Sequence, residues 1–217
     1  MKTFYGIGIG PGDPELLTLK ALRVINESSI IFVPASKGKS LAKEIVKGYL
    51  MGKKIIELNF PMGEENKFNY KEAAKIINEV FRDIDVACFL TLGDPLTYST
   101  FIYLYREINK FGIKVEIIPG VTSYNAAFSK IKLPFAVKNE SVLITDKNIE
   151  LDKVNDIDKI IFLKANNKKE IIKKLKEKGF KNYYIKRCTL DGEKILMDEE
   201  DIEKDEDYLA LIISFRE

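Results

Sequence analysis

Residues 6–17 read GIGIGPGDPELL, and a second Gly-Asp-Pro occurs at residues 93–95 inside FLTLGDPLTYST (89–100). At both places an apolar run changes directly into a pattern typical of a helix. Asp followed by Pro suits the start of a helix, because Asp caps free backbone amides and proline has no amide hydrogen to leave unpaired. Each Gly-Asp-Pro therefore predicts a loop that leaves a strand and opens a helix.

The same alternation of apolar runs and helix-period segments continues over the first 130 residues. It is typical of β-α units on a mainly parallel sheet. The expected strands cover residues 4–10, 29–34, 54–58, 86–92 and 114–120. The expected helices cover residues 14–25, 40–50, 70–81 and 98–109.

A third turn of small residues, PGVTSYNAA (119–127), again follows an expected strand and opens a helix. In a parallel sheet such turns emerge at the carboxyl ends of the strands, where open α/β sheets hold their ligands. Three such turns predict one shared crevice. A single turn of this kind is equally well explained as a simple reversal of the chain. The dinucleotide fingerprint G-x-G-x-x-G is not met, because Pro11 and Asp13 stand where its third glycine is needed.

The second part of the chain has shorter apolar runs and one clear helix. Strands are expected at residues 141–145, 159–165, 182–188, 194–198 and 208–215, and a helix at 167–178. We therefore predict an α/β fold with two lobes, a mainly parallel N-terminal lobe at residues 1–133 and a mixed C-terminal lobe at 134–217. The boundary falls near Leu133 and Pro134, where a helix-like segment ends and the strand order restarts.

Composition limits the partners that this chain can have. Its 35 Lys and Arg against 33 Asp and Glu give a net charge of +2, which argues against a nucleic-acid-binding surface. The Lys-rich segment 164–181 has Ile171, Ile172 and Leu175 at helical spacing, which is typical of a solvated helix face. No apolar run approaches the roughly 20 residues of a membrane span, and no export signal is recognisable. We expect a cytoplasmic protein with no membrane or nucleic-acid partner.

The chain has no histidine, which excludes a His general base, a Ser-His or Cys-His nucleophile and a His-ligated zinc. Its two cysteines, Cys88 and Cys188, support neither a disulfide framework nor a four-cysteine metal site. We expect no metal site in the protein. Its chemistry must rely on carboxylates, hydroxyls, backbone groups or a bound cofactor.

Three stretches in this order, YGIGIGPGDPELLTLKA (5–21), FLTLGDPLTYST (89–100) and EIIPGVTSYNAA (116–127), resemble the tetrapyrrole methylase family. The stretches IIFVPASK (30–37) and LNFPMGEEN (58–66) resemble the branch that methylates C20 of precorrin-2 or cobalt-factor II in cobalamin biosynthesis. The resemblance implies a homodimeric methyltransferase that acts on a small-molecule tetrapyrrole. It also implies an active site in the cleft between the two lobes, with S-adenosylmethionine (S-adenosyl-L-methionine) as cofactor.

The resemblance further implies which residues form the site. The implied cofactor contacts are Pro11, Leu92, Gly93, Asp94, Thr97, Thr122, Ser123 and Leu163. The first loop, with Gly10 and Gly12, should line the tetrapyrrole trough. The carboxylates around such a ring call for cations, and Lys37, Lys39 and Lys67 are candidates, although each also fits an ordinary surface lysine.

Methyl transfer from a sulfonium needs alignment and a favourable electrostatic setting rather than a covalent nucleophile, which suits a chain without histidine. Asp94 is the candidate catalytic residue. It could place a charge near the sulfonium or accept the proton that must leave the macrocycle, and a structural role as a turn or cap residue is left open. The alternatives are a methyltransferase of the same fold acting on another tetrapyrrole position, an RNA ribose or a protein side chain, or a non-catalytic nucleotide-binding module. Whether the substrate carries cobalt is also left open.

Overall fold

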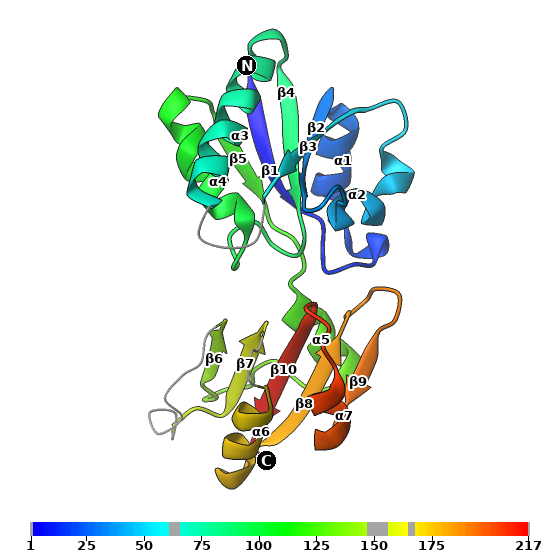
Figure 1. Ribbon diagram of the computed structural model, residues 1–217, viewed down its shortest axis with the longest axis vertical. Coiled ribbons are helices and arrows are strands. Elements are labelled where there is room, and N and C mark those ends of the chain that lie inside the picture. Colours follow the sequence, from blue (N-terminus) through cyan, green and yellow to red (C-terminus); the bar gives the residue numbers. More distant parts are fainter. Residues whose placement is uncertain (1, 61–65, 147–155, 165–167, 217) are drawn as a thin grey trace. The chain divides into compact units, whose positions relative to one another are not determined.

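The structure, a computed structural model, describes residues 2–60, 66–146, 156–164 and 168–216 (Figure 1). The chain divides into two compact units, Met1–Thr122 and Ser123–Glu217. The expected boundary at residues 133–134 lies at the other end of helix α5 (Ser123–Ile131), which belongs to the second unit. Helix α5 belongs to the second unit because its side chains contact that unit. Phe128 lies edge-on against Phe135, with 5.4 Å between ring centroids, and Lys130 pairs with Glu193.

The first unit contains a five-stranded sheet in the order β3-β2-β4-β1-β5. All neighbouring strands are parallel, as predicted. The strands are β1 (Thr3–Gly8), β2 (Ile30–Ala35), β3 (Lys54–Asn59), β4 (Val86–Thr91) and β5 (Val115–Ile118). The apolar runs of the three central strands β2, β4 and β1 are buried on both faces, which is why the sequence shows continuous rather than alternating hydrophobicity there.

Strand β2 does not end at Pro34 as expected, but continues to Ala35. It pairs with β4 only through Ile30–Phe32. Pro34 lies beyond that pairing, opposite Leu58 of β3. Its missing amide hydrogen therefore removes no bond to β4, and the strand tolerates it.

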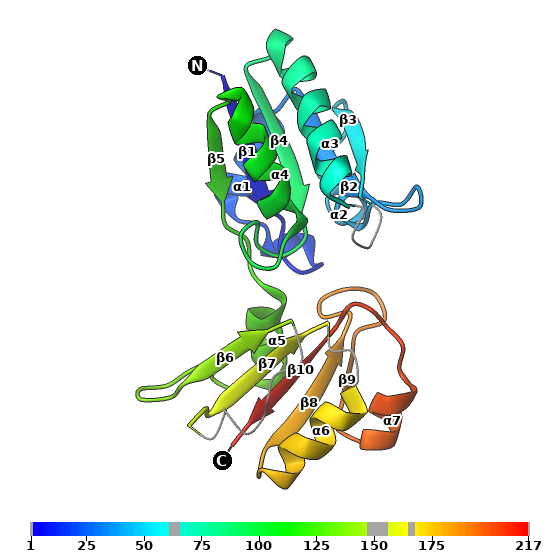
Figure 2. The same ribbon diagram turned by 60° about the vertical axis from the view of Figure 1, so that its left-hand side comes forward.

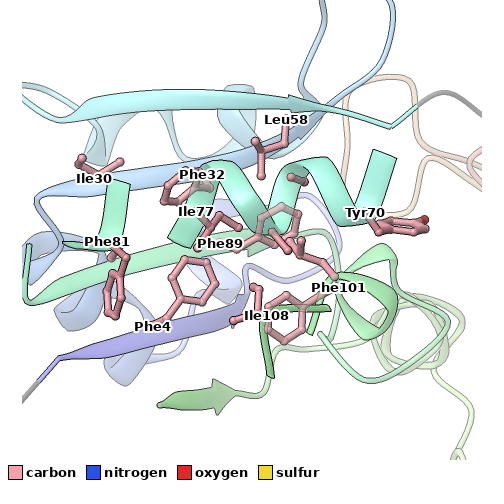
Figure 3. Close-up of a cluster of buried hydrophobic side chains, with 14 of the residues drawn as sticks. Phe4, Ile30, Phe32, Leu58, Tyr70, Ile77, Phe81, Phe89, Phe101 and Ile108 are labelled. Atoms are coloured by element: carbon pink, nitrogen blue, oxygen red, sulfur yellow. The ribbon is translucent and has the colours of Figure 1, made fainter. Parts of the chain in front are cut away.

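Four helices cover the two faces of this sheet: α1 (Leu19–Glu27), α2 (Leu41–Ile45), α3 (Asn66–Val80) and α4 (Thr100–Ile108). Helices α1 and α2 lie on one face, and α3 and α4 lie on the other (Figures 1 and 2). The core under α3 and α4 is aromatic, with Phe4, Phe32, Phe89 and Phe101 fully buried (Figure 3). Tight packing there fixes the positions of the strand ends.

The expected continuous helix over residues 14–25 is wrong. A short 3₁₀ turn at Pro14–Leu16 is capped by Asp13, and Leu17 is extended. Thr18 then starts α1, and its hydroxyl accepts a hydrogen bond from the amide of Ala21 at 3.1 Å. The threonine cap restarts the helix because its side chain satisfies an amide that would otherwise lack a partner.

Strands β1 and β4 are neighbours, but the chain leaves them in opposite directions. After β1 it passes through α1 to β2, on the far side of β4; after β4 it passes through α4 to β5, on the far side of β1. The two helices lie on opposite faces (Figure 2). Such a reversal of strand order opens a crevice at the carboxyl ends of the strands, where ligands bind in open α/β sheets.

The second unit holds a mixed sheet, as predicted. Its five strands lie in the order β6-β7-β10-β8-β9. Only β6 and β7 are parallel. Its elements are β6 (Val142–Thr145), β7 (Lys159–Leu163), α6 (Lys168–Glu177), β8 (Lys181–Lys186), β9 (Lys194–Leu196), α7 (Glu199–Lys204) and β10 (Ala210–Phe215). Helix α7 was not expected from the sequence. None of the helices in the described part of the chain could cross a membrane.

Candidate active site

The two Gly-Asp-Pro loops pair with each other beyond the ends of β1 and β4. The amide of Gly10 donates to the carbonyl of Gly93 at 3.3 Å, and the amide of Gly93 donates to the carbonyl of Gly10 at 2.8 Å. Both glycines have left-handed backbones, with φ of 80° and 67°, which side chains disfavour. The predicted meeting of the first loop (residues 9–13) with the second loop (residues 92–98) is confirmed.

The third turn (residues 119–122) reaches the same point. A Cβ on Gly120 would lie 2.2 Å from the carbonyl oxygen of Gly93, and a Cβ on Gly8 would lie 2.6 Å from the amide nitrogen of Gly120. Three backbone segments therefore touch where no side chain fits. Beside Gly93 there is room, since a Cβ there would have no atom of the described residues within 4 Å.

The carboxylate of Asp94 joins the second loop to the third turn. Its Oδ1 accepts from the amide of Leu96 at 2.9 Å and from the hydroxyl of Thr97 at 3.1 Å. Its Oδ2 accepts from the amide of Gly120 at 3.2 Å. Asp94 is half-buried, and its side chain thus connects segments that are 26 residues apart.

Two buried hydroxyls close the base of the second loop. Thr91 Oγ1 and Ser99 Oγ lie 3.0 Å apart, and Ser99 Oγ also accepts from the amide of Phe101 at 3.1 Å, which caps α4. Sequence reasoning missed both residues. A serine directly before a helix was a usable signal for Ser99, whereas its pairing with Thr91 depends on the folded loop.

Most of the residues expected to contact the cofactor lie in these joined segments. Pro11 is buried in the first loop, directly after Gly10, and Gly12 is buried beside it. The second loop contains Leu92, Gly93, Asp94 and Thr97, and the third turn ends at the buried Thr122. Ser123 begins α5. Leu163 ends β7 in the second unit, opposite Leu211 of β10. That these residues contact a cofactor stays a prediction.

Comparison with known proteins decides the family. The sequence profile described as "Tetrapyrrole (Corrin/Porphyrin) Methylases" matches residues 3–202. The chain belongs to this family. The resemblance seen in the three glycine-containing stretches is thus confirmed.

Two curated relatives of this tetrapyrrole methylase carry related names. The "Probable cobalt-precorrin-2 C(20)-methyltransferase" of Methanocaldococcus jannaschii is 36% identical, over 98% of this chain and 96% of that protein. The "Cobalt-precorrin-2 C(20)-methyltransferase" of Salmonella typhimurium is 34% identical over 64% of this chain and 61% of that protein. Among solved structures, a uroporphyrin-III C-methyl transferase from Thermus thermophilus, complexed with S-adenyl homocysteine, has a TM-score of 0.74 at 19% identity. It covers 98% of this chain and 97% of its own, and shows that the two share a fold.

The three lysines predicted to bind substrate carboxylates lie in two different elements of the methylase. Lys37 and Lys39 are exposed in a tight turn directly after β2, where the amide of Ser36 donates to the carbonyl of Lys39 at 3.0 Å. They therefore stand at the same edge of the sheet as the ends of β1 and β4. Lys67 lies in α3, but its side chain is outside the described part of the structure. Their contact with substrate stays a prediction.

Neither thiol of the methylase is suited to nucleophilic catalysis. Cys88 and Cys188 are both buried and free. Burial raises the pKa of Cys88 to about 12 and that of Cys188 to about 11, so both are protonated at neutral pH. Within the described residues no group of three or more acidic or cysteine side chains could hold a metal ion. The joined loops instead offer backbone groups, hydroxyls and one carboxylate.

Proposed function

We propose that this tetrapyrrole methylase is a methyltransferase that transfers a methyl group from S-adenosylmethionine to C20 of precorrin-2 or cobalt-factor II in cobalamin biosynthesis. The two relatives named as C20-methyltransferases support the choice of ring carbon. The observation that carries the proposal is the contact of three glycine turns at the point where the strand order reverses. This is where a cofactor can approach backbone groups closely.

The residues present fit the cofactor. A Cβ at Gly93 would meet no atom of the described residues within 4 Å, so this side of the second loop leaves room for a ligand to approach the backbone. S-adenosylmethionine, when bound, supplies a methyl carbon already activated by its sulfonium. The protein then has to align this carbon with the acceptor and exclude water. We assign the holding of the cofactor to Pro11, Leu92, Gly93, Asp94, Thr97, Thr122, Ser123 and Leu163.

The proposed acceptor is a flat macrocycle fringed with carboxylates. Gly10 and Gly12 of the first loop would let it lie close to the backbone, and Lys37, Lys39 and Lys67 would pair with its carboxylates. Any cobalt would belong to the substrate.

An anaerobic assay tests the proposal directly. Metal-free precorrin-2 and cobalt-factor II are offered separately with S-adenosylmethionine labelled in its methyl group, and the product is analysed by NMR. We expect label at C20 of at least one product. Label at another ring carbon would favour a methyltransferase for another tetrapyrrole position, and label in neither product, with both substrates intact, would refute the assignment.

Ligand titration distinguishes the methyltransferase from the alternative, a non-catalytic nucleotide-binding module. Titration with S-adenosylhomocysteine should show saturable binding, and titration with NAD or GTP should show none. The reverse result would replace the methyltransferase with a nucleotide-binding module.

We further propose that the protein is a cytoplasmic homodimer, as the family resemblance implies. Light scattering coupled to size-exclusion chromatography should give twice the 24.8 kDa mass of one chain. The mass of a single chain at micromolar concentration would contradict the dimer. Cell fractionation that places the protein with the membranes would contradict the location.

A further inference from the structure

Both Gly-Asp-Pro aspartates cap a local turn, and the side chain of Asp94 also bonds a distant segment. Asp13 Oδ1 accepts from the amide of Glu15 at 2.9 Å, two residues further along, and so caps the local 3₁₀ turn. Asp94 makes the equivalent local bond to Leu96 with Oδ1, but its Oδ2 extends to the amide of Gly120. The carboxylate of Asp94 therefore combines a local capping bond with a bond to a segment 26 residues away.

The bond to Gly120 matters because of what surrounds it. The carbonyl oxygen of Gly93 is already so close to the backbone of Gly8 and Gly120 that no Cβ fits between them. Packing at this crossing limits how near the third turn can come. The hydrogen bond from Gly120 to the carboxylate adds attraction and direction, since a charge-assisted bond is about twice as strong as a neutral one.

The third turn leads, two residues after Gly120, to the buried Thr122 and then to Ser123 at the start of α5. Its position therefore sets where Thr122, a predicted cofactor contact, stands relative to the second loop. We infer that Asp94 is a positioning residue, whose carboxylate fixes the third turn against the second loop and so aligns the two halves of the cofactor site. It does not take up the proton that leaves the macrocycle. This inference rests on the proposed function.

The variant Asp94→Asn tests the inference. Its side chain has nearly the same shape but a single acceptor oxygen, so it can serve the Leu96 and Thr97 donors or the Gly120 amide, but not both. We expect the Kd for S-adenosylhomocysteine to rise about tenfold. At saturating S-adenosylmethionine we expect kcat to fall by a smaller factor than the Kd rises, and we expect the pH profile of kcat to keep its shape.

A residue that takes up the proton would behave differently. Removing a general base lowers kcat by about 10²- to 10⁴-fold. In that case Asp94→Asn would leave the Kd for S-adenosylhomocysteine unchanged and would remove the acidic limb of the pH profile. This result would overturn the inference. Asp94→Glu adds a second comparison: it should weaken cofactor binding as much as Asp94→Asn, whereas a retained base would keep kcat and Kd close to the wild type.

Hydrogen exchange tests the bond from the Gly120 amide to the Asp94 carboxylate, which we call the tether, without any ligand or turnover. The amide of Gly120 should exchange at least tenfold faster in Asp94→Ala, which has no side-chain acceptor, than in the wild type, and unchanged exchange would overturn the inference. If the wild type binds no S-adenosylhomocysteine, the proposed function fails, but the exchange result still decides whether the tether exists.

The matched control is Asp198→Asn. Asp198 Oδ1 accepts from the amides of Glu200 and Asp201 at 2.9 and 3.3 Å and caps α7 in the second unit. The substitution makes the same chemical change at a helix cap outside the proposed site. We expect no change in the Kd for S-adenosylhomocysteine or in the exchange of Gly120.

Discussion

At Gly120 the neighbouring backbone segments leave no room for a side chain. A Cβ there would lie 2.2 Å from the carbonyl oxygen of Gly93 and 2.8 Å from the Cα of Gly8. Both are backbone atoms, so no side-chain rotation relieves the clash and the third turn must move. We predict that Gly120→Ala lowers the free energy of unfolding by about 2 kcal/mol, in the range of overpacked cores, and weakens binding of S-adenosylhomocysteine at least tenfold.

Urea denaturation and ligand titration measure the two effects. Gly48→Ala is the matched control, because a Cβ at Gly48 would meet no atom of the described residues within 4 Å. It should leave binding unchanged and should not lower the free energy of unfolding, because alanine at a compatible helical position stabilises slightly. Wild-type stability in Gly120→Ala would show that the turn can shift freely, and would contradict the close crossing.

At the same scale, the sequence located most of the second loop but not its internal bonds. Gly93 and Asp94 were identifiable because Gly-Asp-Pro after an apolar run is a strong local signal. The bond from Gly120 to Asp94 and the pair Thr91–Ser99 were not, since both depend on how folded segments meet. Local patterns carry information about caps and turns, whereas contacts between distant segments need the strand order.

Among the elements, the strands were predictable because each is a continuous apolar run between polar segments. The exceptions have local causes. The break between Leu17 and Thr18 was missed because helix-period apolar residues continue across it, although Thr18 is a good cap. Helix α7 was missed because Ile202 is its only buried residue, which gives no periodicity to detect. The strand order β3-β2-β4-β1-β5 could not be read from local pattern at all.

Helix α4 begins at the base of the second loop, and its cap should couple the stability of the helix to that of the loop. We predict that Ser99→Ala costs about 2 kcal/mol, roughly 1 for the lost cap and 1 for the buried hydroxyl of Thr91 that loses its bond. Ser40→Ala, which removes the cap of α2 at Lys43, should cost only about 1 kcal/mol. Thermal or urea unfolding of both variants gives the comparison.

The double variant Thr91→Val with Ser99→Ala separates the cost of the lost cap from the cost of the lost bond between the two hydroxyls. If the hydroxyls interact, its cost should be smaller than the sum of the two single costs, because the second substitution removes a group that has already lost its partner. Strict additivity would contradict the proposed coupling.

At the scale of the whole molecule, each of the two units has hydrophobic clusters of its own. Asp205 belongs to the second unit. Its Oδ1 accepts from the hydroxyl of Tyr184 at 2.8 Å and from the amide of Asp207 at 2.9 Å, and its Oδ2 pairs with Lys186. Burial alone would raise the pKa of Asp205, but these three donors outweigh it and lower the pKa to about 2.

This lowered pKa predicts how acid acts on the second unit. An unfolded Asp has a pKa of about 3.9, so the stabilisation from the ionised Asp205 is complete above that value and is lost as the pH falls through about 2. We expect Asp205→Asn to be less stable than the wild type at pH 7 by about 1 kcal/mol, allowing for screening by solvent, and the gap to close between pH 4 and pH 2. Urea unfolding of both proteins at several pH values, followed by hydrogen exchange of amides in β8 and β10, measures this gap for the second unit. A gap that stayed constant down to pH 2 would mean that Asp205 titrates alike in the folded and unfolded chains, and its three donors would then contribute nothing to acid stability.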